Sequence, residues 1–353
     1  MRNLFDPKRD EEILEITHEG ALRLIEQGHP EADVLRWIEE TVPDAITEAA
    51  KPIAEELKRT SYRMVLEHQA IRRGLEARLA HRWLDGLVLY ESVLVASQEM
   101  GSEFAQHHRD GAAEEHDLVF EALVRLQARA CLTASEILSL LRSGYPFGAH
   151  ARWRTLHELA VVAGLIARSG REIAERYLLH QGIQEAKDAE DYQKYAERLG
   201  YEPFPADEMQ AHRKLRAELI ERFGRAFKNP YGWAVPLFEG NTDPKFRDLE
   251  KLAGLDHLRP HYGWASHRVH AGAKGAALNI VSRGPESAYL TGPTNAGLAD
   301  PGHWGPDLSL AGDDRPDSVR SRIGRGVATR HGDGYRFSAA CRRGRRRVLA
   351  CAS

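Results

Sequence analysis

Residues 118–168 read LVFEALVRLQARACLTASEILSLLRSGYPFGAHARWRTLHELAVVAGLIAR, and this stretch decides the fold class. It contains two runs in which apolar residues recur three and four positions apart, the spacing of an amphipathic helix. Between the runs, the glycines of SGYPFG free the backbone while Pro146 fixes φ, which predicts a turn. We therefore expect an antiparallel helical hairpin over about residues 118–168. The residues that we expect in its core are Leu123, Ile137, Leu156 and Val162.

The sequence on both sides of the hairpin also has a helical period. Further helices are predicted over residues 10–28, 34–40, 62–100, 172–199, 207–227, 245–253 and 262–270. The helix over 34–40 is expected to end before Pro43, and only residues 288–291 resemble extended chain. No internal repeat and no alternation of strands with helices is visible in the sequence. The fold class is therefore predicted to be all-α, a multi-helix bundle organised on the hairpin.

Two changes in composition predict the domain organisation. Residues 101–111 are polar and bounded by glycines, so we expect a break between an N-terminal helical segment, 1–110, and a central helical bundle, 111–304. Residues 305–353 contain eleven arginines and seven glycines but neither lysine nor glutamate, and they have no helical period. We expect this tail to be disordered or translated out of frame. The alternative is a basic arm that binds nucleic acid.

The overall composition is that of a soluble globular protein, with 42% apolar and 29% charged residues. A formal net charge of -3 argues against a protein coated by nucleic acid. The first residues lack the apolar segment of a secretory signal, and the apolar run 159–167 is about half a membrane span. Three cysteines provide neither a disulfide framework nor a metal-ligand spacing. We expect a cytoplasmic protein without a membrane partner or a cofactor.

A first polar cluster opens the second helix of the predicted hairpin. Arg154, His157 and Glu158 are three and four residues apart, so they share one helix face, and His150 lies one turn earlier. An Arg–Glu pair could orient His157 as a general acid or base. The alternative is a structural, partly buried Arg154–Glu158 ion pair, with His157 bonded to a backbone carbonyl.

A second polar cluster lies in residues 262–275, which read YGWASHRVHAGAKG. If this segment is helical, His270 shares a face with both Ser266 and His267. His270 could activate Ser266 as a nucleophile, or the two histidines could bind a metal together with a carboxylate from another helix. No metal is expected. The candidate catalytic residues of both clusters are Arg152, Arg154, His157, Glu158, Ser266, His267 and His270.

Three motifs in order resemble a bacterial family known only as a domain of unknown function. They are LRSGYP (141–146) with ARWRTLHE (151–158), then YxxASxxVHA (262–271, where x is any residue), then GPTNAGLADPGH (292–303). The resemblance covers about residues 60–304 and implies a helical cytoplasmic protein with no established activity. In such relatives an apolar helix follows the last motif. The tail of this chain departs from that pattern, which favours the frame-shift interpretation.

A second resemblance concerns mechanism. Arg152 and His157, with four residues between them, are similar to the Arg-x(4–6)-His motif of the HEPN superfamily of helical toxin and defence ribonucleases. This resemblance implies metal-independent attack of an RNA 2′-hydroxyl on its phosphate, promoted by the histidine and the arginine. It also implies RNA as a partner and a homodimer that brings two motifs together.

Two classes of function follow from these observations. The first is an enzyme in which both polar clusters line a shared pocket, with RNA cleavage as the reaction. The second is a non-catalytic helical module that binds a partner or a small ligand, in which the polar residues fix the register of the helices. Convergence of the two clusters in one cleft is the feature that an enzyme requires.

Overall fold

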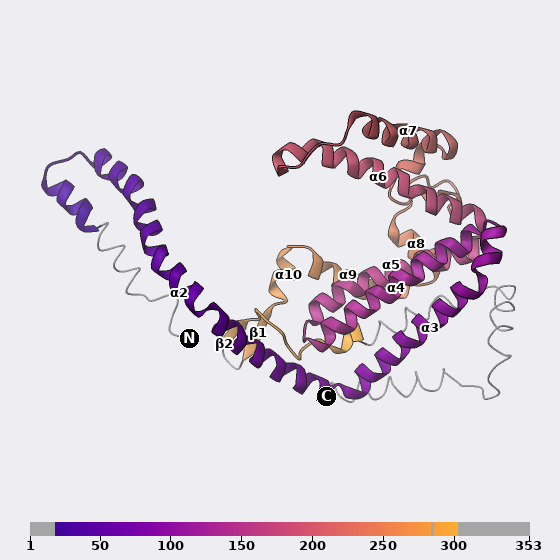
Figure 1. Cartoon of the computed structure of the whole chain (residues 1–353), viewed down its shortest axis with the longest axis horizontal. Coiled ribbons are helices and arrows are strands. Elements are labelled where there is room, and N and C mark those ends of the chain that lie inside the picture. The colour runs from indigo at the N-terminus through magenta and orange to yellow at the C-terminus, as the bar shows by residue number, and fades with distance from the viewer. Residues whose placement is uncertain (1–17, 284–285, 303–353) are drawn as a thin grey trace. The chain divides into compact units, whose positions relative to one another are not determined.

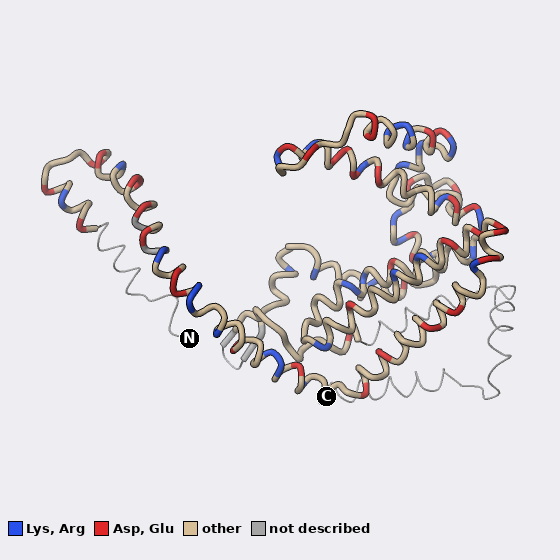
Figure 2. Tube along the Cα trace, viewed as in Figure 1, with Lys and Arg blue, Asp and Glu red and all other residues tan. Residues whose placement is uncertain are grey.

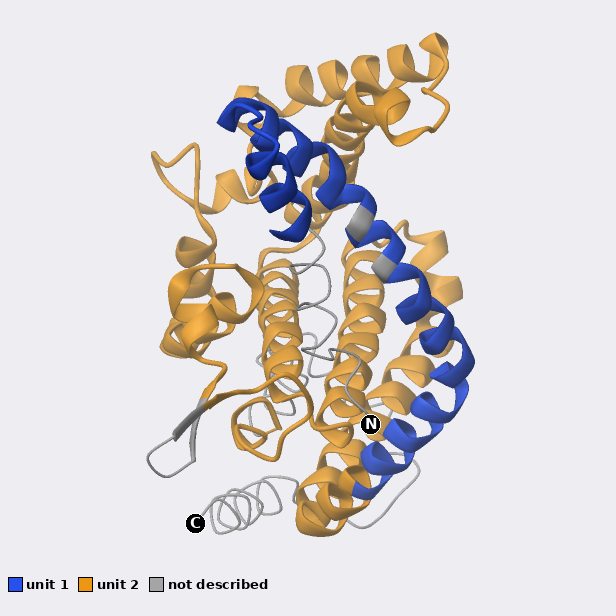
Figure 3. Cartoon of the chain, turned by 90° about the vertical axis from the view of Figure 1, so that its left-hand side faces the viewer, with its two compact units in different colours: residues 1–74 blue, residues 75–353 orange. Residues whose placement is uncertain are grey.

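The computed structural model describes residues 18–283 and 286–302 (Figure 1). The chain divides into two compact units, residues 1–74 and residues 75–353 (Figure 3). The expectations for residues 10–17 and for the tail, 305–353, concern positions outside the described residues.

The described chain is built almost wholly of helices, which confirms the predicted all-α class. The α-helices are α2 (Glu31–Arg82), α3 (Leu84–Glu114), α4 (Leu118–Arg142), α5 (Pro146–Ser169), α6 (Arg171–Leu199), α7 (Ala206–Phe223), α8 (Phe246–Ala253), α9 (Arg259–Val269) and α10 (Ala273–Ala277). The short 3-10 helices are η1 (Arg225–Lys228), η2 (Gly232–Leu237) and η3 (Asp256–Leu258). Acidic and basic residues are interspersed along the helices (Figure 2). No helix in the described part of the chain is long and apolar enough to cross a bilayer.

The predicted helical hairpin is present as α4 and α5, and local signals fix both of its ends. Asp117 caps α4, because its carboxylate accepts hydrogen bonds from the amides of Val119 and Phe120, each at 3.0 Å. Gly144 follows α4 with φ of 77°, a left-handed conformation that favours glycine. Pro146 then starts α5, where its missing N–H costs nothing.

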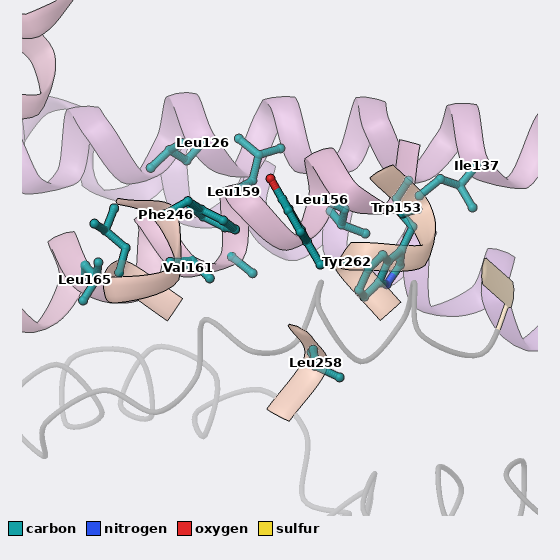
Figure 4. Packing of buried hydrophobic residues seen from close by; sticks show 14 of the residues in the cluster. Leu126, Ile137, Trp153, Leu156, Leu159, Val161, Leu165, Phe246, Leu258 and Tyr262 are labelled. Atoms are coloured by element: carbon teal, nitrogen blue, oxygen red, sulfur yellow. The ribbon is translucent and has the colours of Figure 1, made fainter. Parts of the chain in front are cut away.

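The second unit is assembled around this hairpin. Helix α3 packs on α4, α6 packs on α4 and α5, and α8 and α9 pack on α5. Figure 4 shows Trp153, Leu156 and Tyr262 among the side chains that fill the space along the hairpin. Of the four predicted core residues, Ile137 and Leu156 are buried, whereas Leu123 and Val162 are half-buried at the edge of the core.

The first unit departs from the expectation at its prolines. Helix α2 contains both Pro43 and Pro52 and does not end before Pro43, so the predicted stop after residue 40 is wrong. The residues around both prolines are largely good helix formers such as Glu, Ala and Lys, and they propagate the helix despite the lost hydrogen bonds. Near the start of this unit, Gly20 packs against the ring of Trp37.

The break predicted at residues 101–111 is also wrong, because α3 runs through this segment to Glu114. The physical reason is tertiary packing: Phe104 lies 6.0 Å from Phe120 of α4 between ring centroids, and Gly101 lies close to the Gln127 side chain. The described helices α2 and α3 meet instead at Trp83. The chain turns after α3 at His116, which has a positive φ of 48°.

The segment after α10 was expected to be extended only at residues 288–291. It forms an antiparallel pair of strands, β1 (Ile280–Arg283) and β2 (Glu286–Tyr289), with Ile280 opposite Tyr289. Residues 291–302, which carry the third motif, then cross the tip of the hairpin. The amide of Thr294 donates to the Gly144 carbonyl at 2.8 Å, and Trp83 Nε1 donates to Asn295 at 2.7 Å. The third motif is thus tied to the turn that the first motif forms.

Candidate functional site

The three motifs meet where α9 lies against α5. Tyr262, near the start of α9, contacts the middle of α5, whereas Arg268, near its end, stacks on Phe147 at the start of α5. The two helices therefore run antiparallel. We call this contact the α5–α9 seam, and its residues are Phe147, His150, Trp153, Arg154, His157 and Glu158 on α5 and His261, Tyr262 and Arg268 on α9.

One end of the seam, which we call the paired end, is held by a buried histidine and a buried glutamate. His157 Nε2 lies 2.8 Å from Glu250 Oε1 of α8, and both side chains are 0% exposed. The second oxygen of Glu250 accepts a hydrogen bond from Arg259 at 2.6 Å. A buried carboxylate is costly unless it is paired, and here both of its oxygens have a partner.

A second set of bonds lies beside this one at the paired end. Glu158 Oε1 accepts hydrogen bonds from Arg154 Nε at 3.1 Å and from the Tyr262 hydroxyl at 2.6 Å. The guanidinium groups of Arg154 and Arg259 lie 4.7 and 4.9 Å from the centroid of the Tyr262 ring. Tyr262 thus joins α9 to α5 by one hydrogen bond, to Glu158, and one cation–π contact, with Arg154, whereas its contact with Arg259 lies within α9.

Burial determines the protonation of the groups at the paired end. It lowers the pKa of His157, and the Glu250 carboxylate acts in the opposite direction. Burial, together with the nearby Glu158 carboxylate, raises the pKa of Tyr262. At neutral pH Tyr262 is therefore a hydrogen-bond donor, and a neutral His157 donates from Nε2 to Glu250. The Nδ1 atom of His157 has no partner among the described residues.

The other end of the seam, which we call the unpaired end, consists of His150, Trp153 and Arg268. Trp153 is 0% exposed and His150 is 8% exposed. Trp153 Nε1, His150 Nε2 and Arg268 NH1 are all buried atoms without a hydrogen-bond partner in the described part of the chain. The ring centroids of His150 and Trp153 are 5.7 Å apart, and the Arg268 guanidinium lies 3.5 Å from the Phe147 centroid. This end of the seam thus carries three buried polar atoms that have no hydrogen-bond partner among the described residues.

Electrostatics connect the third motif to the unpaired end. Burial lowers the pKa of His150, and the Asp300 carboxylate opposes this shift, as does a backbone hydrogen bond with His261. Arg268 and His261 add to the lowering. Burial also lowers the pKa of the Arg268 guanidinium. Asp300 itself is exposed.

The predicted site residues of α5 point in different directions. Arg154 and Glu158 form the ion pair that the spacing suggested, but His157 binds Glu250 and not a backbone carbonyl. Arg152 faces the opposite helix, where it pairs with Glu136 and lies 3.5 Å from the Thr133 hydroxyl of α4. Arg152 and His157 are thus bound to partners on different helices.

The predicted residues of the second cluster do not form one face. Helix α9 ends at Val269, and His270 caps it with extended backbone angles, so the expected helix over 262–270 is one residue too long. His270 is exposed, and the Ser266 hydroxyl donates to the Tyr262 carbonyl at 2.9 Å. His267 is half-buried. No group of three or more metal-binding side chains is found among the residues that the structure describes.

Several site residues were absent from the sequence prediction. Glu250 and Arg259 complete the paired end, and Trp153 and Arg268 form much of the unpaired end. Trp153 belongs to the first motif, which was a usable signal for it, whereas Arg268 occupies an unspecified position of the second motif. Glu250 follows an apolar residue in a short amphipathic helix and carries no comparable signal.

An apolar pocket lies apart from the seam. Its volume is about 460 Å³, which includes the space at its open mouth. It is lined by Leu79, Trp83, Gly86, Leu87, Tyr90, Leu141, Leu298, Ala299 and Gly302. The polar atoms in its wall are already bonded, since Trp83 donates to Asn295 and the Tyr90 hydroxyl donates to the Ala134 carbonyl. Among the described side chains that line it, the pocket therefore offers mainly apolar surface.

Comparison with known proteins supports the resemblance drawn from the motifs. No curated protein and no solved structure matches this chain. The first two motifs lie within the residues that match a family model, and the third motif lies beyond them. Residues 120–287, which include α4, α5, α8 and α9, match a family of unknown function (DUF5677).

Proposed function

We propose that this chain is a non-catalytic helical module that binds a small polar ligand at the unpaired end of the α5–α9 seam. The observation that carries this proposal is the gathering of three buried, unpartnered polar atoms on His150, Trp153 and Arg268. Leaving a buried donor or acceptor unsatisfied costs about 1–3 kcal/mol. A ligand that bonds to several of these atoms at once would recover much of that free energy.

The contrast between the two ends of the seam supports this choice of site. At the paired end, both oxygens of Glu250 and the hydroxyl of Tyr262 have partners. Such a network fixes the register of α5, α8 and α9, and at this end His157 Nδ1 lacks a partner among the described residues. At the unpaired end, α5 and α9 present three buried polar atoms that have no partner within the described chain.

The geometry of the Arg-x(4–6)-His pattern favours a binding module over a ribonuclease. His157 Nε2 is hydrogen-bonded to Glu250 at 2.8 Å, so this nitrogen is not free to exchange a proton with an RNA substrate. Arg152 is held by Glu136 on α4. Acid–base catalysis requires both groups within hydrogen-bond reach of one substrate. The Arg152 and His157 partners lie on α4 and α8, which separates them.

The proposal is tested by the indole N–H resonances of the tryptophans in a ¹⁵N-labelled sample. A defined set of small carboxylates, phosphate esters, amides and sugars is added one class at a time. We expect at least one class to shift the Trp153 resonance, assigned with Trp153→Phe, and to raise Tm. The matched control is Trp83, whose Nε1 already donates to Asn295 and whose resonance should stay in place.

Two outcomes contradict the proposal. One is that no class of compound moves the Trp153 resonance at millimolar concentration. The other is that the purified chain cleaves RNA and that His157→Ala abolishes cleavage without unfolding the protein. The second result would return the function to the ribonuclease class.

A further inference from the structure

We infer that the ligand of the unpaired end carries an oxyanion, such as a carboxylate, sulfate or phosphate group. This inference rests on the proposed function and adds the chemical class of the ligand. The inference is based on the hydrogen-bonding groups of Trp153 and Arg268, which are all donors. The indole Nε1–H and the guanidinium N–H groups donate hydrogen bonds and never accept them.

Arg268 supplies the positive charge that would attract an oxyanion. No ion pair of Arg268 is found among the described residues, and its terminal nitrogen NH1 is buried without a hydrogen-bond partner. Its close neighbour is the ring of Phe147, at 3.5 Å from the guanidinium to the centroid. This cation–π contact does not satisfy NH1, which has no acceptor among the described residues. A charge-assisted hydrogen bond to an oxyanion would satisfy it.

Trp153 sets the size of the group that enters. Its side chain is 0% exposed, so only a compact head group can reach Nε1. An oxyanion has several acceptor oxygens within one small volume, which suits a site that contains more than one donor. A bulky ligand could still bind if its anionic head were the part that enters.

His150 completes the site as a third donor. His150 is 8% exposed, its Nε2 has no hydrogen-bond partner in the described chain, and the Asp300 carboxylate interacts with the ring electrostatically. A bound oxyanion would favour the protonated ring, which donates from Nε2. Arg268 and His261 disfavour that form when no anion is bound. Anion binding and proton uptake by His150 should therefore be coupled.

The test measures anion binding by isothermal titration calorimetry, with the Trp153 resonance as the reporter of position. Sodium sulfate, sodium phosphate and sodium acetate form three arms, and sodium chloride at equal ionic strength is the control. We expect at least one oxyanion to bind and to shift Trp153, while chloride does neither. Arg268→Gln should weaken binding at least about ten-fold, and Arg268→Lys should lose less because it keeps the charge.

A matched variant, Arg213→Gln, removes an exposed arginine on α7 and should leave binding unchanged. The inference fails if a neutral amide or sugar shifts Trp153 while all three oxyanions do not, and the proposed binding function would then survive. It also fails if Arg213→Gln weakens binding as much as Arg268→Gln, which would mean a nonspecific charge effect. If nothing shifts Trp153, the proposed function itself has failed.

Discussion

Removing the carboxylate of Glu250 should be far more destabilising than removing one from an ordinary ion pair. Glu250→Ala deletes the acceptor for His157 Nε2 at 2.8 Å and for Arg259 at 2.6 Å. It leaves an imidazole that is 0% exposed without its partner. Leaving this buried donor without its acceptor costs about 1–3 kcal/mol, and the charge-assisted bond to Arg259 is lost as well. Glu250→Gln keeps an acceptor for His157 but loses the charge, so it should cost less than Glu250→Ala.

The comparison variant is Glu136→Ala, which breaks a half-exposed ion pair with Arg152. A pair of that kind contributes about 0–1 kcal/mol. Urea unfolding followed by circular dichroism measures all three variants, and the m-value must stay constant for the comparison to hold. If Glu250→Ala costs no more than Glu136→Ala, the paired end does not hold the helices and the division of the seam is wrong.

Three further predictions follow from the described contacts. Burial lowers the pKa values of His150, His157 and His180, so the folded state keeps them neutral while the unfolded chain binds protons below about pH 6.5. The free energy of unfolding should be highest above that pH and should fall as pH decreases, by up to about 1.4 kcal/mol per histidine and pH unit. A urea midpoint that does not change between pH 7.5 and 5.5 would contradict this prediction. Gly144→Ala should lower the free energy of unfolding by about 1–3 kcal/mol, because φ is +77° and a Cβ would lie 3.0 Å from Leu79 and 3.2 Å from the Thr294 carbonyl. The control is Gly111→Ala, whose Cβ would have no atom within 4 Å and which should be neutral or stabilising in the same assay. Translation of the coding DNA beyond codon 304 in the other two frames should yield an apolar-periodic helix in one of them, and stop codons in both would refute the frame-shift interpretation.

The hairpin was predictable because its signals are local. The apolar period of residues 118–168, the capping Asp117 and the turn before Pro146 each act within a few positions of the chain. The errors arose where tertiary contacts or neighbouring residues outweighed such signals. Gly101 and Gly111 suggested a break, but packing of Phe104 against Phe120 keeps α3 helical.

The site was predictable only in part, for a related reason. The Arg154–Glu158 pair follows from a spacing of four residues on one helix. Glu250 lies 93 positions from His157 in the sequence, and no local pattern connects them. The unpaired end is harder still to foresee. It is defined by buried atoms of Trp153 and Arg268 that have no hydrogen-bond partner. Such an absence can be recognised only once the positions of the surrounding side chains are known.

The central claim, that the unpaired end of the seam binds an oxyanion, is tested most directly by diffraction from crystals soaked in selenate. Selenate has the shape and charge of sulfate, and its selenium gives an anomalous signal that water does not. The account predicts an anomalous peak whose oxygens lie within hydrogen-bond distance of Trp153 Nε1 and Arg268 NH1. An ordered water at that position, with no selenium peak beside those two atoms, would contradict it.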